Sequence, residues 1–249
     1  MSMDNFGLYK LMHEDAPKNN NPLLEQPTLA KTHTTDPIVT GTSVLAIKFN
    51  GGVAIAADTL ASYGSMARFR DIERLKSFGK YTIVGASGEY SDFQYIEEQV
   101  KQSLIDRDYQ LDDGRSTTPR EIYQYLVRVL YNRRNKFDPL YNVLVIAGYE
   151  NGKAFLGQTD YLGTHFEDVT LATGYGSYIA QPILRKFYSE KNGNITEQEA
   201  KDILKKCLTV LFYRDARAAD KVQIAVINDQ GPKIDEPIKL ETQWTFKGF

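Results

Sequence analysis

The pair Gly41-Thr42 carries the strongest chemical signal in this chain of 249 residues. An apolar run, Val44 to Phe49, follows the pair, and a Gly-rich turn and a second apolar run lead to Asp58. This pattern predicts a β-hairpin that presents Thr42 at a sheet edge. Cleavage before Thr42 would release a threonine whose own amine can accept the hydroxyl proton. One residue would then supply both nucleophile and base.

Three later segments strengthen this signal, in the order Gly85-Ala86-Ser87-Gly88, Thr173-Gly174-Tyr175-Gly176-Ser177 and Tyr213-Arg214-Asp215-Ala216. Together with the opening hairpin they resemble the proteasome β-subunit family, the N-terminal-nucleophile threonine hydrolases. The resemblance runs from about Thr34 to Asn228. Within the family the chain is most similar to the seventh β-type of fungal core particles, a non-catalytic type, through Pro37 to Val44, Tyr63-Gly64-Ser65 and Leu211 to Arg217.

The resemblance also implies which catalytic group is missing. In active members a lysine at the position of Arg74 lies close to the threonine and tunes its ionisation. Burial can lower a lysine pKa from about 10.4 to roughly 7–8, so that the amine takes part in proton transfer. Arginine stays charged, with a pKa above about 12. Arg74 can therefore hold a shape but cannot transfer a proton.

The remaining positions of the family site are partly retained. Asp58 matches the aspartate that pairs with the lysine, Gly88 the glycine whose N–H serves the oxyanion hole, and Asp215 the aspartate that steadies the threonine. Tyr175 and Ala218 stand where active members have two serines. The resemblance therefore implies a vestigial site, made of Thr42, Asp58, Arg74, Gly88, Tyr175, Asp215 and Ala218.

The residues alone also allow purely structural roles. Asp58 and Arg74 can form a buried ion pair that fixes the hairpin against the next segment. Gly88 can serve a tight turn from strand to helix. Gly174 and Gly176 do not indicate a nucleotide site, because the third glycine and the expected strand-helix unit are missing.

Three functions remain open at this point. The resemblance favours a structural subunit of a proteasome core particle, placed with other α and β subunits in stacked seven-membered rings. Such a subunit would support ATP- and ubiquitin-dependent protein degradation by neighbouring threonine proteases, in cytoplasm and nucleus. The alternatives are an active threonine endopeptidase that uses Thr42 and tolerates Arg74, and a stand-alone N-terminal-nucleophile amidase.

Composition excludes several classes of protein. The net charge of −2 makes nucleic acid or an anionic membrane an improbable partner. The sequence has no apolar run of the roughly 18–20 residues that a membrane span needs. The single cysteine, Cys207, excludes an internal disulfide and favours a reducing compartment. His13, His33 and His165 lack the spacing of metal ligands, so we expect neither a metal nor a cofactor.

The two ends of the chain differ from its middle. Residues 1–33 have the composition of a flexible segment, which the resemblance identifies as a propeptide cleaved between His33 and Thr34. A β-type domain is expected over 34–236 and a C-terminal extension over 237–249. In the extension, Trp244, Phe246 and Phe249 alternate in a way suited to laying a strand on a partner subunit.

The expected fold follows from the order of the elements. Hairpins are predicted near residues 42–58 and 143–157, a strand over 81–85 and a last strand over 222–227. Helices are predicted from about Ser91 to Ile105, from Thr118-Pro119 onward, and as a pair after Gly176 whose second member opens at Thr196. Strand pairs that alternate with helix pairs favour two stacked sheets covered by helices on both sides. The α+β four-layer αββα sandwich of the resembled family fits this order, and a doubly wound α/β fold fits it less well.

Overall fold

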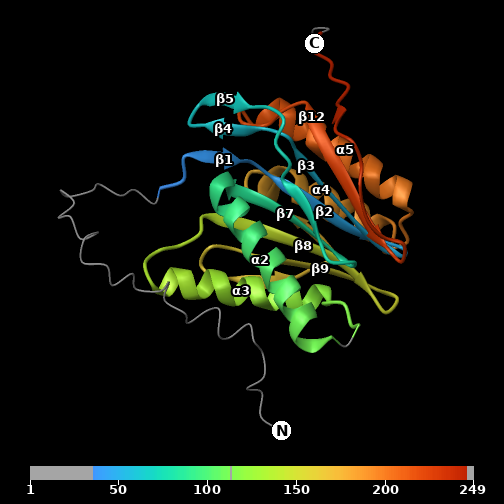
Figure 1. Ribbon diagram of the computed structural model, residues 1–249. Helices are drawn as coiled ribbons and strands as arrows, with labels where there is room; N and C mark the ends of the chain where they lie inside the picture. Colours follow the sequence, from blue (N-terminus) through green and yellow to red (C-terminus); the bar gives the residue numbers. More distant parts are fainter. Residues whose placement is uncertain (1–35, 113, 246–249) are drawn as a thin grey trace, which may run out of the picture.

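The computed structural model describes residues 36–112 and 114–245, which form two sheets and four long helices (Figure 1). The elements in chain order are β1 (Val39–Gly41), β2 (Val44–Phe49), β3 (Gly52–Asp58), β4 (Ala61–Tyr63), β5 (Met66–Phe69), β6 (Leu75–Phe78), β7 (Thr82–Glu89), α2 (Tyr90–Leu111), α3 (Pro119–Asn135), β8 (Asn142–Glu150), β9 (Lys153–Thr159), β10 (His165–Glu167), β11 (Thr170–Ala172), α4 (Gly176–Glu190), α5 (Glu197–Arg214), β12 (Lys221–Asn228), β13 (Gly231–Ile234) and β14 (Ile238–Lys239).

The strands form two antiparallel sheets. The eight-stranded sheet has the order β10-β9-β8-β7-β1-β4-β5, with β6 also paired to β7. The six-stranded sheet has the order β11-β2-β3-β12-β13, with β14 also paired to β12. The two central hairpins, β2–β3 and β8–β9, lie in different sheets.

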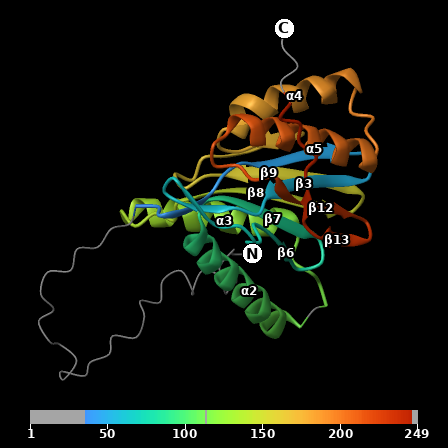
Figure 2. The same ribbon diagram turned by 90° about the horizontal axis from the view of Figure 1, so that it is seen from above.

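Three apolar cores hold four layers together. One core lies between the two sheets and includes Val44, Ile55, Ile83 and Val145. A second joins the eight-stranded sheet to α2 and α3, and a third joins the six-stranded sheet to α4 and α5. Figure 2 shows the helix pairs on opposite outer sides of the stacked sheets. The predicted αββα sandwich is therefore confirmed.

Local sequence signals explain where two of the helices begin. The Thr118 side chain accepts the N–H of Glu121 while the Glu121 carboxylate accepts the N–H of Thr118. Thr196 and Glu199 form the same reciprocal pair before α5. Each pair satisfies N–H groups that have no partner within the helix, so both helices start where the sequence predicts.

The buried face of α5 also matches its prediction. Cys207 is fully buried in a row of apolar side chains, with Ile203, Leu204, Leu208 and Leu211. Burial raises the pKa of the Cys207 thiol to about 12, which keeps it protonated and unreactive. Its role in the described structure is packing.

The segment around Thr42 differs from the predicted single hairpin. Gly41 ends β1, which pairs with β4 and β7 of the eight-stranded sheet. The six-stranded sheet begins only at Val44, in β2. Thr42 and Ser43 therefore carry the chain from one sheet to the other, and Thr42 does not start a hairpin strand at a sheet edge.

The C-terminal segment lies on the domain for part of its length. Ile238 pairs with Val222 of β12, and the Leu240 side chain is buried in the core beneath α5. Trp244 packs edge-on against Phe212 and Tyr213, with ring centroids 5.8 and 5.2 Å apart, and stays 69% exposed. The expected partner residues Phe246 and Phe249 and the expected cleavage site, His33-Thr34, lie outside the described residues.

Candidate functional site

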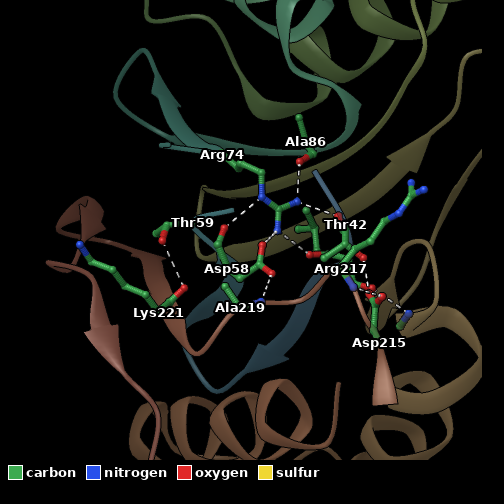
Figure 3. Close-up of polar contacts among 12 residues, drawn as sticks. Thr42, Asp58, Thr59, Arg74, Ala86, Asp215, Arg217, Ala219 and Lys221 are labelled. Atoms are coloured by element: carbon green, nitrogen blue, oxygen red, sulfur yellow. Dashed lines mark hydrogen bonds and ion pairs between the residues drawn. The ribbon is translucent and has the colours of Figure 1, made fainter. Parts of the chain in front are cut away.

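A buried arginine organises the site around Thr42 (Figure 3). Arg74, which precedes β6, is 2% exposed, and its guanidinium has five N–H groups to satisfy. Two of these bind Asp58, through its main-chain oxygen at 3.0 Å and its carboxylate at 2.5 Å. The other three contacts reach the main-chain oxygens of Thr42, Ser43 and Ala86, at 2.7, 3.0 and 3.1 Å.

Asp58 completes this ion pair at the end of β3. Its second carboxylate oxygen accepts the N–H of Ala219 at 2.8 Å, so the loop before β12 joins the same network. Burial has the largest effect on the Asp58 carboxyl and raises its pKa, while the Arg74 guanidinium and the Ala219 amide oppose that shift. The expected buried pair between Asp58 and Arg74 is therefore present.

The Thr42 hydroxyl points to a different carboxylate. Its Oγ1 donates to Oδ2 of Asp215 at 2.5 Å. Asp215 ends α5 and is itself buried, and its other oxygen accepts the N–H of Arg217 at 2.9 Å. The two aspartates thus have different roles: Asp58 neutralises Arg74, and Asp215 binds the Thr42 hydroxyl.

The glycine before Thr42 lies directly against the arginine. A Cβ atom built on Gly41 would stand 2.5 Å from Cδ and 2.9 Å from Nη1 of Arg74. Only glycine, which has no side chain, leaves room for the guanidinium at this end of β1. Packing against Arg74 therefore requires the glycine at position 41, whether or not the bond after it is ever cut.

Gly88 lies opposite Gly41 but is not part of a turn. It pairs with Gly41 in the ladder between β1 and β7, and β7 continues to Glu89. Its φ is +93°, and a Cβ there would stand 2.1 Å from the main-chain oxygen of Tyr141. The predicted turn is thus a strand residue with a left-handed backbone that only glycine adopts without strain.

The loop before α4 packs on the residue after Thr42. Ser43 is buried, and its Oγ accepts the N–H of Gly176 at 2.9 Å. Thr173 accepts the N–H of Val44 at 2.8 Å through its hydroxyl. Tyr175 directly precedes α4 and is 61% exposed. Ala218 lies in the turn after α5 and donates its N–H to the main-chain oxygen of Asp215 at 3.1 Å.

Three residues of this region were not predicted to matter. Ser43 carries the contact to α4, and Asn142 donates to the main-chain oxygens of Ser87 and Glu89 at 3.2 and 2.8 Å. Glu89 accepts two main-chain N–H groups from the segment before Gly41. Glu89 lies just before a predicted helix, but its burial and these contacts are known only from the structure.

The site offers few groups for other chemistry. Among residues 36–112 and 114–245, no cluster of three or more His, Cys, Asp or Glu side chains is placed to hold a metal ion. No helix within those ranges is long and apolar enough to cross a membrane. The site contains the Thr42 hydroxyl, which Asp215 binds, and the Arg74 guanidinium, whose N–H groups all have acceptors. The strand β1 lies beside them.

The arginine should be essential to stability. Arg74→Met leaves the Asp58 carboxylate buried without its cation, so we expect the free energy of unfolding to fall by about 3–5 kcal/mol in urea denaturation. Adding Asp58→Asn should recover part of the loss, because the unpaired charge is gone. Arg185→Met, which removes an exposed arginine 3.3 Å from Asp168, should cost less than about 1 kcal/mol. Equal losses for both arginines would contradict this account.

Comparison with known proteins places the chain in a family. The family model described as "Proteasome subunit" matches residues 38–227. The chain is 53% identical over 212 residues to "Proteasome subunit beta type-4" of Dictyostelium discoideum, covering 85% of this chain and 81% of the relative. It is 42% identical over 216 residues to "Probable proteasome subunit beta type-7" of Schizosaccharomyces pombe, covering 86% and 82%. It is 39% identical over 222 residues to "Proteasome subunit beta type-7" of Saccharomyces cerevisiae, covering 86% and 84%. The chain belongs to the proteasome subunit family.

Proposed function

We propose that this chain is a non-catalytic β subunit of a proteasome core particle. It occupies one place in a seven-membered ring, stacked with other α and β rings. There it supports ATP- and ubiquitin-dependent degradation by neighbouring threonine protease subunits, in cytoplasm and nucleus. The relatives named proteasome subunit beta type-4 and type-7 support the assignment to this subunit type.

The state of Arg74 carries the proposal that the subunit is inactive. Each of its five N–H contacts is made to a main-chain oxygen or to Asp58, and arginine does not release a proton near neutral pH. In the intact chain the Thr42 nitrogen is an amide, which cannot act as a base. Nucleophilic attack needs a group that takes the hydroxyl proton, and neither of these groups can.

An active threonine hydrolase remains the second candidate because of one observation. The Thr42 hydroxyl is held by Asp215 at 2.5 Å, and Gly88 lies one strand away. These are the parts of an active site that this chain keeps. They can orient a nucleophile, but they supply no replacement for the lysine.

Covalent labelling separates the two candidates. A threonine-directed covalent inhibitor added to purified particles should modify the active subunits and leave Thr42 unmodified, as read from peptide masses. The active subunits of the same particle are the internal positive control. Arg74→Lys alone should not restore labelling, since Tyr175 and Ala218 still replace the two serines. Modified Thr42 in the unaltered chain would overturn the assignment.

The same deficit should prevent self-cleavage. We expect the bond between Gly41 and Thr42 to stay intact in assembled particles. Any trimming should come from an active neighbour at an upstream site, with the bond after His33 as the expected position. N-terminal sequencing of the purified subunit checks this and should find Thr34 first. A chain that begins at Thr42 would show that the threonine cuts its own bond.

The C-terminal segment should contribute to assembly. Trp244 packs against Phe212 and Tyr213 but stays mostly exposed, and an exposed tryptophan is a typical anchor for a partner. Deletion of residues 243–249 should reduce the yield of complete double-ring particles, as followed by native mass measurement. Ile105→Ala, at an exposed position on α2, is a control that removes apolar surface elsewhere. Normal yield and normal neighbour activity after the deletion would exclude a bracing role.

A further inference from the structure

One carboxylate joins the N-terminal strand to the start of a helix. Oε2 of Glu89 accepts the main-chain N–H of Ile38 at 2.5 Å and that of Val39 at 2.9 Å. Oε1 faces the other way and accepts the Ser91 hydroxyl at 2.9 Å, at the first turn of α2. Each oxygen of the side chain therefore serves a different element.

The main chain of Glu89 is fixed on both sides, so the carboxylate has a defined position. Its N–H donates to the main-chain oxygen of Tyr141 at 2.9 Å, and its own oxygen accepts from Asn142 at 2.8 Å. The residue is 8% exposed and stands at the N-terminus of α2, where the helix dipole favours a negative charge. A carboxylate held in this way must be matched by donors. Val39, the first residue of β1, provides one of them, and Ile38, directly before the strand, provides the other.

The strand that Glu89 holds is short and is paired on both sides. β1 contains three residues and lies between β4 and β7, with Thr40 opposite Glu89 and Ser62. It ends at Gly41, directly before the threonine that Asp215 holds. The residues of β1 thus occupy the slot between β4 and β7, which ends next to Thr42.

We propose that Glu89 is a binding site for the main-chain N–H groups of an extended segment, and that residues 38–41 are its resident occupant. Glu89 is then a positioning residue. It keeps β1 in the slot beside Thr42 and so excludes any other extended peptide from that place. This role depends on the hydrogen bonds that hold the strand and not on proton transfer.

Hydrogen exchange on the full-length chain tests the contact from the strand side. Ile38→Pro removes one N–H donor without altering Glu89, α2 or the paired residues of β1, whereas Ile38→Ala removes the side chain and keeps the donor. We expect the amides of Val39, Thr40 and Gly41 to exchange at least tenfold faster with proline and within about twofold of the original rate with alanine. Protease cleavage before Gly41 should accelerate in parallel.

A second pair of variants tests the contact from the glutamate side. Glu89→Asp still caps α2 but withdraws the carboxylate by about one C–C bond, ~1.5 Å, so β1 amides should again exchange at least tenfold faster while α2 amides do not. Glu98→Gln, on the exposed face of the same helix, is the control for lost charge.

Two results would overturn the proposal. One is equal exchange of the β1 amides in the proline and alanine chains, and the other is faster exchange confined to α2 in Glu89→Asp. If proline prevents folding, the amides of β2 lose protection as well, and Glu89→Asp then decides by the same comparison. Labelling of Thr42 tests whether the subunit is inactive, and hydrogen exchange tests whether Glu89 holds β1. Either proposal can therefore fail without the other.

Discussion

The buried guanidinium of Arg74 is the constraint on which the arrangement around Thr42 depends. A charged group removed from water requires an acceptor for each of its donors, and Arg74 collects them from both sheets. Ala86 belongs to the eight-stranded sheet, Asp58 to the six-stranded sheet, and the oxygens of Thr42 and Ser43 to the link between them. One side chain therefore fixes the distance between the sheets where the chain crosses.

The same position explains how a catalytic framework can serve architecture alone. A lysine there would offer three donors from a mobile ammonium and could release a proton. Arginine offers five donors in a rigid plane, and here each has an acceptor. The Gly41 backbone can approach only because it carries no side chain. Arginine at position 74 therefore fixes the geometry of this region, and it also removes the group that could transfer a proton.

Signals confined to a few neighbouring residues made much of the fold predictable. The pairs Thr118-Glu121 and Thr196-Glu199 mark helix starts, and the apolar runs that flank Gly51 and Gly152 mark hairpins. The position of β1 was not predictable in this way. Its partners lie far along the chain, and a three-residue strand ending in glycine has no periodicity to detect.

The candidate site also contains residues that the sequence predicts and residues that it does not. Thr42, Asp58, Arg74 and Asp215 were expected together because a family pattern names their positions, and the structure brings them together. Glu89 and Ser43 act through main-chain groups of distant segments, which leave no mark in the sequence. The strand β5 was missed because it is exposed along its whole length and has no buried face, and β4 was missed because it has only three residues.

The place of β1 in the sheet order has a further consequence for solubility. In the described chain β4 pairs with β1 and β5, and β1 alone connects that hairpin to β7 (Figure 1). A chain without β1 would carry two additional rows of unpaired main-chain groups, one on β4 and one at the end of β7. Such open rows recruit strands from other molecules and promote aggregation. The three residues of β1 thus close an inner gap in the sheet, and the intact bond to Thr42 keeps the strand attached.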